Sequence, residues 1–456
     1  MTHKKCPPGL IRIGLLFTVA LTLAVPASAE WNEKVLYSFQ GGTNDGSYPV
    51  GGVVFDSQGN LYGVLQDYGP GSCAPIGNEC GAVYQLTPPT QKGGSWTETL
   101  IYEFQGKGAN DGESPNGGLL IDSQGNLYGV TAYGGTGDCV LLGVPAGCGT
   151  VYELSPPRQK GGAWTETILY SFLTAKQGYV PNGNLVFDGA GNFYGATMFG
   201  GSKGTTCDGS YGGQCGVVFE LSPPKKKGGK WTEKVLHSFA GIANGQQTGD
   251  GANPNGGLVL DGKGSVYGTT YGGGSGDWGT VYELKPPTGK GGAWTEKQLH
   301  VFTTGNAGGL PSAGVIFDSN GNLYGTTLGT LFRLAPPSKK TGHWKRTTLY
   351  AFCNQGGGGC EPEGSLTFDN SGRLYGTTYY GFGAELYGSV FRLRAPAKKG
   401  EAWVVDYLYG FLYAPDGLYP AAQLVFDKAG NLYSTTTGGG RGTCSRYCGT
   451  VFEVGP

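Results

Sequence analysis

The stretch FDSQGNLYG, residues 55–63, decides the fold because it recurs along the whole chain. Nearly the same letters, IDSQGNLYG, stand at 121–129, and looser copies bring the total to seven. Such a recurring unit indicates one supersecondary element that buries its core only against its neighbours. The looser copies begin at Phe187, Leu260, Phe317, Phe368 and Phe426.

Each copy belongs to a unit in which several strand patterns follow one another. In WTETLIYEF, residues 96–104, large apolar side chains fall on alternate positions, which is typical of a strand with one buried face. GGLLID at 117–122 is apolar on both faces and predicts a fully buried strand. LYGVT at 127–131 and GTVYEL at 149–154 complete four strands per unit. The tryptophans that open the outer strands are Trp31, Trp96, Trp164, Trp231, Trp294, Trp344 and Trp403.

Seven units of four antiparallel strands predict an all-β chain folded as a seven-bladed β-propeller. A lone tryptophan-type strand at 31–39 opens the chain, and three strands between 422 and 454 close it. We therefore expect the N-terminal strand to complete the last blade. In each motif copy an Asp ends the innermost strand and Gly-Asn permits the reversal, so these aspartates are expected to make turns. They are Asp56, Asp122, Asp188, Asp261, Asp318, Asp369 and Asp427.

Residues 1–29 have the pattern of a signal peptide, with Lys4, Lys5 and Arg12 near the start, an apolar run, and Ala-Ser-Ala at the cleavage point. The run is too short to cross a bilayer as a helix. We therefore expect a secreted protein, periplasmic or extracellular, without a membrane span and with residues 30–456 as one domain. Removal of the signal leaves four more acidic than basic residues, a balance that argues against nucleic acid as a partner.

Ten cysteines remain beyond the signal peptide, and they fall into five close couples. An even number of local couples in an exported chain predicts five short-range disulfides. Zinc binding is the alternative interpretation, but the couples are scattered and only three histidines remain. We expect neither a metal nor a cofactor. The couples are Cys73/Cys80, Cys139/Cys148, Cys207/Cys215, Cys353/Cys360 and Cys444/Cys448.

The unit resembles the GloVer (Gloeobacter/Verrucomicrobia-type) tandem repeat of exported bacterial proteins. The segment DGANPNGGLVLDGKGSVYGTTYGGGSGDWGTVYELKPP, residues 250–287, carries the pattern most fully, and the resemblance extends over residues 31 to 456. It implies a propeller-like exported protein with no established activity, so it assigns no catalytic residues. Because the chain stops at Pro456 directly after the last strand, we do not expect the C-terminal anchor for which the family is partly named.

The strand order places all cysteine couples on one face of the disc, together with glycine-rich loops that differ between blades. Stiffened loops on a rigid scaffold suit a binding surface; the alternative is that long extracellular loops simply need staples. Aromatic side chains beyond the second strand gather on the same face and suit stacking on sugar rings, although they also suit plugging the base of each loop. The candidate ligand contacts are Trp278, which lies outside the repeat position, and Tyr133, Phe199, Tyr271 and Tyr380.

Asp-Gly pairs recur on this face and place Asp45, Asp111, Asp250 and Asp416 near the expected mouth of the central channel. Paired carboxylates there would suit general acid/base work; the alternative is that they belong to turns.

We expect a monomeric, exported binding or scaffold module for carbohydrate or another envelope component. A polysaccharide hydrolase or lyase using channel-mouth carboxylates is one alternative, and a structural surface protein without a ligand is another. A close pair of carboxyls at the mouth favours the enzyme, whereas glycine backbone and isolated tyrosines favour binding.

Overall fold

The computed structural model describes residues 31–42, 45–67, 73, 80–141, 143–202, 215–242, 249–289, 291–303, 308–339, 342–352, 360–381, 387–398, 400–442, 444 and 448–456. The predicted signal peptide, residues 1–29, lies outside the described residues.

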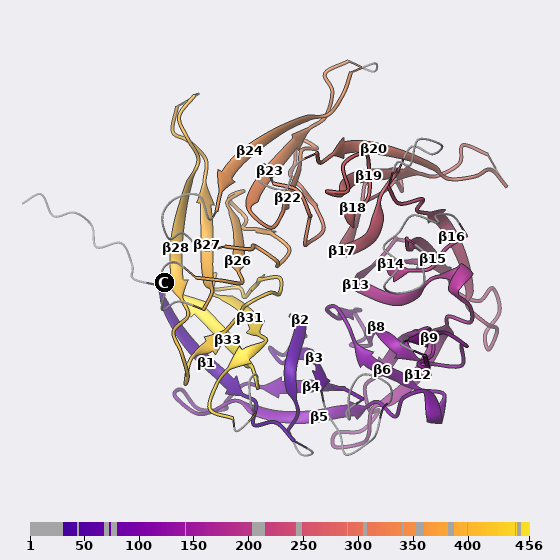
Figure 1. Cartoon of the computed structure of the whole chain (residues 1–456). Helices are drawn as coiled ribbons and strands as arrows, with labels where there is room; N and C mark the ends of the chain where they lie inside the picture. The colour runs from indigo at the N-terminus through magenta and orange to yellow at the C-terminus, as the bar shows by residue number, and fades with distance from the viewer. Residues whose placement is uncertain are drawn as a thin grey trace, which may run out of the picture.

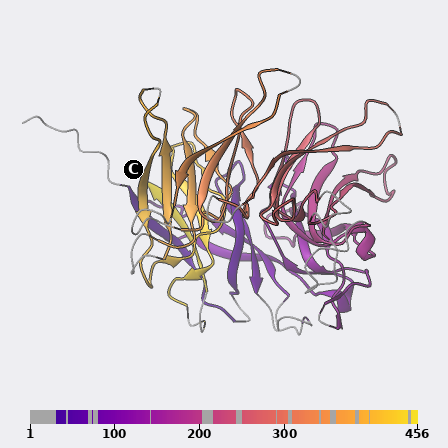
Figure 2. The ribbon, with the colours of Figure 1, turned by 45° about the horizontal axis from the view of Figure 1, so that its top comes forward.

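Seven antiparallel sheets surround a central axis and confirm the predicted seven-bladed propeller (Figure 1). In each sheet the first strand lies toward the axis and the fourth lies at the rim, as β2 and β5 illustrate in Figure 1. Figure 2 shows the connections projecting from the two faces of the disc.

The strand bounds of the first four blades follow the chain order. Blade 1 is β2 (Ser47–Phe55), β3 (Leu61–Asp67), β4 (Ala82–Thr87) and β5 (Thr97–Glu103). Blade 2 is β6 (Gly112–Pro115) with β7 (Leu120–Ile121), then β8 (Leu127–Gly134), β11 (Thr150–Ser155) and β12 (Thr165–Ser171). Blade 3 is β13 (Tyr179–Phe187), β14 (Phe193–Phe199), β15 (Val217–Ser222) and β16 (Thr232–Ser238). Blade 4 is β17 (Ala252–Leu260), β18 (Val266–Gly272), β19 (Thr280–Lys285) and β20 (Thr295–Val301).

The last three blades have shorter inner strands. Blade 5 is β21 (Ile316–Phe317), β22 (Leu323–Thr326), β23 (Thr330–Ala335) and β24 (Lys345–Ala351). Blade 6 is β25 (Thr367–Phe368), β26 (Leu374–Thr378), β27 (Ser389–Arg394) and β28 (Val404–Gly410). Blade 7 is β30 (Val425–Phe426), β31 (Leu432–Thr436), β33 (Thr450–Gly455) and β1 (Asn32–Ser38). Outside the blades lie two small pairs, β9 (Val140–Leu141) with β10 (Val144–Pro145) and β29 (Gly417–Leu418) with β32 (Gly438–Gly439), and two 3-10 turns, η1 (Lys107–Ala109) and η2 (Ala175–Gln177). No described helix is long and apolar enough to cross a membrane.

The ring closes as predicted, because β1 pairs antiparallel with β33 from Asn32 opposite Gly455 to Ser38 opposite Thr450. In Figure 1 the indigo β1 runs beside the yellow β33. The N-terminal strand is therefore the outer strand of blade 7, and each blade has a neighbour on both faces.

The aspartate of each motif copy makes the predicted turn. Asp56 accepts hydrogen bonds through Oδ1 from the Gln58 and Asn60 amides at 2.8 and 2.9 Å. Its Oδ2 accepts from the Asn60 side chain at 2.7 Å and from the Tyr62 hydroxyl at 3.1 Å. The same arrangement of hydrogen bonds holds the turns that begin at Asp122, Asp188, Asp318 and Asp427.

The core lies between adjacent blades, where aromatic rings of one blade meet those of the next. Phe39, at the end of β1, lies 5.1 Å from the ring of Tyr84 in blade 1, and both side chains are fully buried. Phe104 makes the same contact with Tyr152 one blade further on. The inner strands are less buried than the sequence predicts: Leu120 and Ile121 are only half-buried, because the inner strand borders the central channel.

The disulfides agree with the predicted local pairing where the structure describes both partners. Cys73 is bonded to Cys80, Cys139 to Cys148 and Cys444 to Cys448. Cys215 and Cys360 are also disulfide-bonded, and their predicted partners, Cys207 and Cys353, lie outside the described residues.

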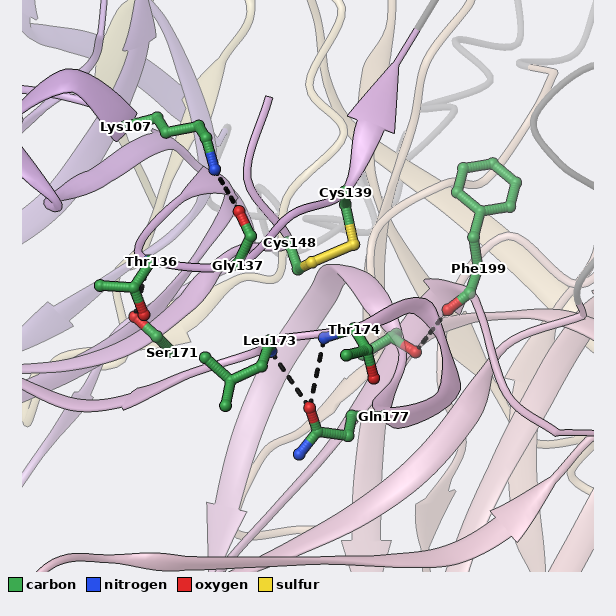
Figure 3. The surroundings of a disulfide bond; sticks show 11 residues. Lys107, Thr136, Gly137, Cys139, Cys148, Ser171, Leu173, Thr174, Gln177 and Phe199 are labelled. Carbon is green, nitrogen blue, oxygen red and sulfur yellow. Dashed lines mark hydrogen bonds between the residues drawn. A yellow bond between two sulfur atoms is a disulfide. The ribbon is translucent and has the colours of Figure 1, made fainter. Parts of the chain in front are cut away.

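The loop that Cys139 and Cys148 close lies against the links between blades (Figure 3). Lys107 Nζ donates to the carbonyl of Gly137, and the Thr136 amide donates to Ser171 Oγ at 3.3 Å. The disulfide loop and the outer-to-inner links therefore share one face of the disc.

Candidate binding site at the channel mouth

Seven residues ring the mouth of the central channel, one at the start of each inner strand, and all adopt a positive φ between 53° and 62°. Each is followed directly by proline. A left-handed conformation is uncommon outside glycine and asparagine, and such strained residues are found where the surrounding structure over-determines them. The seven are Tyr48, Ser114, Val180, Asn253, Leu310, Glu361 and Tyr419.

Hydrogen bonds from the neighbouring blade impose this conformation. The Tyr48 amide donates to the carbonyl of Cys448 at 3.1 Å, and the Ser114 amide donates to that of Cys80 at 2.8 Å. In both of these blades the acceptor is the cysteine two residues before the third strand. The disulfide loops therefore buttress the channel ring, and both lie on the same face.

Glycines behind this ring bring the inner strands together. A Cβ on Gly117 would lie 2.5 Å from the carbonyl oxygen of Gly183, and one on Gly183 would lie 2.3 Å from that of Gly256. Against this glycine-lined backbone, side-chain differences between blades distinguish one sector of the mouth from another.

A cavity of about 350 Å³ opens where blades 6, 7 and 1 meet. Its walls come from three kinds of position: the ring residues, the residues two positions after them in the sequence, and the residues that follow the second strands. Carboxylates and tyrosines dominate the polar lining, whereas Val50 and Ala421 leave room at positions that hold Asn182 and Asn255 in other blades. The lining is Tyr48, Pro49, Val50, Gly51, Glu361, Glu363, Tyr379, Tyr380, Ala421, Ala422, Thr435 and Thr437.

The two glutamates give the cavity its charge. Burial raises the pKa of Glu363 to about 7, with a further contribution from the negative charge of Glu361. Burial also raises the pKa of Glu361. Among the described residues no lysine, arginine or histidine forms an ion pair with either carboxyl. The cavity thus holds one carboxyl that changes its protonation state near neutral pH, beside a second whose pKa is also raised by burial.

Of the predicted ligand contacts, Tyr380 lines this cavity and is 46% exposed. Tyr271, in blade 4, lies within electrostatic reach, because Glu363 and Glu361 both raise its pKa after the larger effect of burial. Tyr133 packs against the core of blades 2 and 3, and Phe199 packs 5.5 Å from the Tyr179 ring. Neither lines the cavity.

Trp278 occupies a position that cysteine holds in other blades. It stands before the third strand of blade 4, and its carbonyl accepts the Leu310 amide at 2.7 Å, as Cys448 accepts that of Tyr48. Its ring packs against the core cluster of Phe302 and Val281. This packing gives the tryptophan a structural role at a position where other blades have a disulfide-bonded cysteine. Ligand contact by Trp278 remains a prediction.

The four Asp-Gly aspartates fasten the outer strand of one blade to the link that follows it. Asp111 accepts the Tyr102 hydroxyl at 2.9 Å and the Gln105 amide at 2.8 Å. In the same way, Asp45 accepts the Tyr37 hydroxyl and Asp416 accepts the Tyr409 hydroxyl. In blade 3, His237 takes the place of the tyrosine and contacts Asp250. None of Asp45, Asp111, Asp250 and Asp416 lines the cavity.

Sequence reasoning missed Tyr48, Glu361 and Glu363. The signal was available, because the residue before the proline varies while the glycines around it recur: YPVGG at 48–52, SPNGG at 114–118 and EPEG at 361–364. A side chain that varies before a proline present in every repeat marks a position that the scaffold does not itself need.

A second hollow, of about 450 Å³, lies between the hairpin turns of blades 6 and 7 on the opposite face. Asp369, Arg373, Asp427 and Trp31 contribute to its walls. Its acids are already engaged, since Asp369 bonds Arg373 at 2.6 Å and Asp427 holds its own turn. The described residues contain no group of three or more histidine, cysteine, aspartate or glutamate side chains able to hold a metal ion.

Comparison with known proteins identifies the repeat. The profile described as the Gloeobacter/Verrucomicrobia repeat matches residues 14–243 and 139–328. No curated protein sequence matches the chain.

Several solved structures are similar to the chain at low identity. A protein of unknown function from Dyadobacter fermentans is 13% identical, with a TM-score of 0.39, over 82% of this chain and 97% of that one. A luciferin-regenerating enzyme is 12% identical, with a TM-score of 0.42, over 93% and 95%. The PQQ domain of a pyranose dehydrogenase from Coprinopsis cinerea is 11% identical, with a TM-score of 0.42, over 94% and 96%.

Proposed function

Because the chain belongs to the Gloeobacter/Verrucomicrobia repeat family, and a cavity opens where blades 6, 7 and 1 of its ring meet, we propose that it is an exported, monomeric glycan-binding module. The observation that carries the proposal is the cavity at the mouth, where Tyr48, Tyr379 and Tyr380 accompany Glu361 and Glu363. Aromatic faces and carboxylates are the groups that bind the apolar face and the hydroxyls of a sugar.

The charge of the cavity favours a neutral glycan. Two carboxyls without a cationic partner would repel a uronate or sulfate group, since like charges brought together in a partly buried site disfavour association. Hydroxyl groups donate to a carboxylate without that penalty, and such charge-assisted hydrogen bonds are the stronger kind.

The cavity also argues against a purely structural role. A surface protein without a ligand has no use for a concave site lined by tyrosines and half-buried carboxyls. The proposal for export rests on the disulfides, which form and persist in oxidising compartments.

Glycoside hydrolysis is the second candidate, and Glu363 favours it. A carboxyl whose pKa is about 7 can donate a proton to a leaving-group oxygen at neutral pH. Glu361, whose pKa is less strongly raised, would be the partner that activates water or attacks the sugar carbon.

Screening of the mature protein against an array of neutral and acidic glycans tests the proposal. We expect binding to neutral glycans that Tyr380→Ala weakens about five- to tenfold, as the loss of an aromatic contact predicts. Tyr133→Ala is the matched control, because Tyr133 stands in the repeat of blade 2 at the position that Tyr380 holds in that of blade 6.

Two outcomes would contradict the proposal: the absence of binding to any glycan, or an equal loss in both variants. Release of reducing ends from a bound glycan, abolished in Glu363→Gln, would assign the hydrolase instead.

A further inference from the structure

A row of tyrosine rings continues from the cavity toward the rim of the disc. Tyr379 lines the cavity and stacks on Tyr419, with ring centroids 4.7 Å apart and planes at 16°. Tyr419 meets Tyr387 at 5.9 Å, and Tyr387 meets Tyr413 at 5.8 Å. Tyr380 joins the same group at 5.9 Å from Tyr419.

The outer end of the row is exposed. Tyr413 is 69% exposed, and the adjacent Leu412 is 53% exposed. Large apolar side chains are rarely left in water as a contiguous set unless they serve an interaction. The row therefore runs from half-buried rings beside the cavity to an exposed ring at its outer end.

The segment that carries Tyr413 is held in place. Asp416 accepts the Leu412 amide at 2.9 Å, the Gly417 amide at 2.7 Å and the Tyr409 hydroxyl at 2.9 Å. Tyr387 is fixed from both sides, because its amide donates to Phe411 O and its carbonyl accepts the Tyr419 amide, each at 2.8 Å. Because the backbone that carries these tyrosines is already fixed, binding to the row loses little conformational entropy.

We infer that the site takes an extended glycan chain rather than a single sugar, with one sugar residue in the cavity and the following residues along Tyr419, Tyr387 and Tyr413. This inference rests on the proposed glycan-binding function. The steps between rings, from 4.7 to 5.9 Å, are comparable to the length of one sugar residue in a chain. A row of aromatic rings suits a repeating polymer because each repeat presents the same apolar face.

Calorimetric titration with neutral oligosaccharides of two lengths tests the inference. The probes are the disaccharides and hexasaccharides of cellulose, chitin, xylan and mannan. We expect a hexasaccharide to bind the wild-type protein at least about tenfold more tightly than its disaccharide, as two or more added aromatic contacts predict.

Two variants separate the row from the cavity. Tyr413→Ala is expected to weaken hexasaccharide binding about five- to tenfold and to leave disaccharide binding unchanged, whereas Tyr380→Ala weakens both. The control is Phe187→Ala, which removes a ring that is 50% exposed at the end of β13.

Equal affinity for the two lengths, or a Tyr413→Ala variant that binds hexasaccharides as the wild type does, would overturn the extended site while leaving the cavity proposal intact. Failure of all eight oligosaccharides to bind would overturn both.

Discussion

The last residue of the motif is glycine because an aromatic ring of the next strand covers it. A Cβ added to Gly129 would lie 2.4 Å from the hydroxyl oxygen of Tyr152 and 2.6 Å from its Cζ. The same overlap occurs between Gly63 and Tyr84. Blade 7 is the exception, since Ser434 lies opposite Phe452 in the register.

Gly129→Ser is therefore expected to destabilise the protein by about 1–3 kcal/mol, the usual cost of overpacking a filled core. Denaturant unfolding measures the change. Ser434→Ala is the control, because its Cβ is already accommodated and only the 3.0 Å hydrogen bond to Gln423 O is lost. A Gly129→Ser protein as stable as the wild type would show that Tyr152 moves aside at no cost.

If the cavity binds glycan as proposed, Glu363 should make that binding depend on pH. Its pKa of about 7 means that the carboxyl becomes ionised as pH rises through neutrality. An ionised carboxylate accepts stronger hydrogen bonds from sugar hydroxyls than a neutral acid does, so affinity should increase across this range.

Titrations about one pH unit on either side of 7 measure this effect, and Glu363→Gln should remove the dependence. The control is Asn116→Ala, which changes the equivalent channel position in blade 2. Affinity that falls with rising pH would favour the protonated acid and hence the hydrolase.

At the scale of the strand, the outer strands carry a buried acid. The glutamate two positions after the tryptophan has a side-chain oxygen without a hydrogen-bond partner in blades 7, 1, 2 and 3. Burial raises the pKa to about 8 for Glu33 and Glu166, and to about 7 for Glu98 and Glu233. The folded state therefore holds these protons more tightly than the unfolded chain, in which glutamate titrates near 4.5.

Stability should decrease as pH rises from about 4.5 toward 8, because over this window the folded protein binds more protons than the unfolded one. Replacement of all four glutamates by glutamine should flatten the dependence. Melting temperatures across the window measure it, and Glu103→Gln, at an exposed position of β5, is the control. A melting temperature that rises steadily between pH 5 and 8 would contradict this account.

The turn aspartates act in the opposite direction. Hydrogen bonds from neighbouring amides and side chains lower the pKa of Asp122, Asp188, Asp318 and Asp427. Their contribution to the free energy of unfolding is fully present above the usual aspartate pKa, and it is lost as pH falls through the lowered pKa. Together the two sets place the greatest stability at mildly acidic pH.

At the scale of the whole molecule, the architecture was predictable and the site was not. Alternating apolar positions and Asp-Gly-Asn turns are local features, so the sequence predicts the strands, the hairpins and the closing role of residues 31–39. The cavity depends on which side chains converge after closure. It depends also on left-handed residues before proline, a position usually extended; here hydrogen bonds such as that from Tyr48 to Cys448 override the local preference.

Ring closure is the property on which the cavity depends, because blades 7 and 1 both supply its walls. The strand β1 buries Leu36 and Phe39 against both blades and covers the edge of β33.

Removal of residues 30–41 is therefore expected to abolish cooperative unfolding and glycan binding together, since blade 7 loses its outer strand and its contact with blade 1. A synthetic peptide of residues 30–41 should restore both when added in excess, by the linkage between binding and folding, and a peptide carrying Leu36→Asp and Phe39→Asp should not. A truncated protein that still unfolds in one transition and still binds glycan would show that the ring holds the cavity without β1.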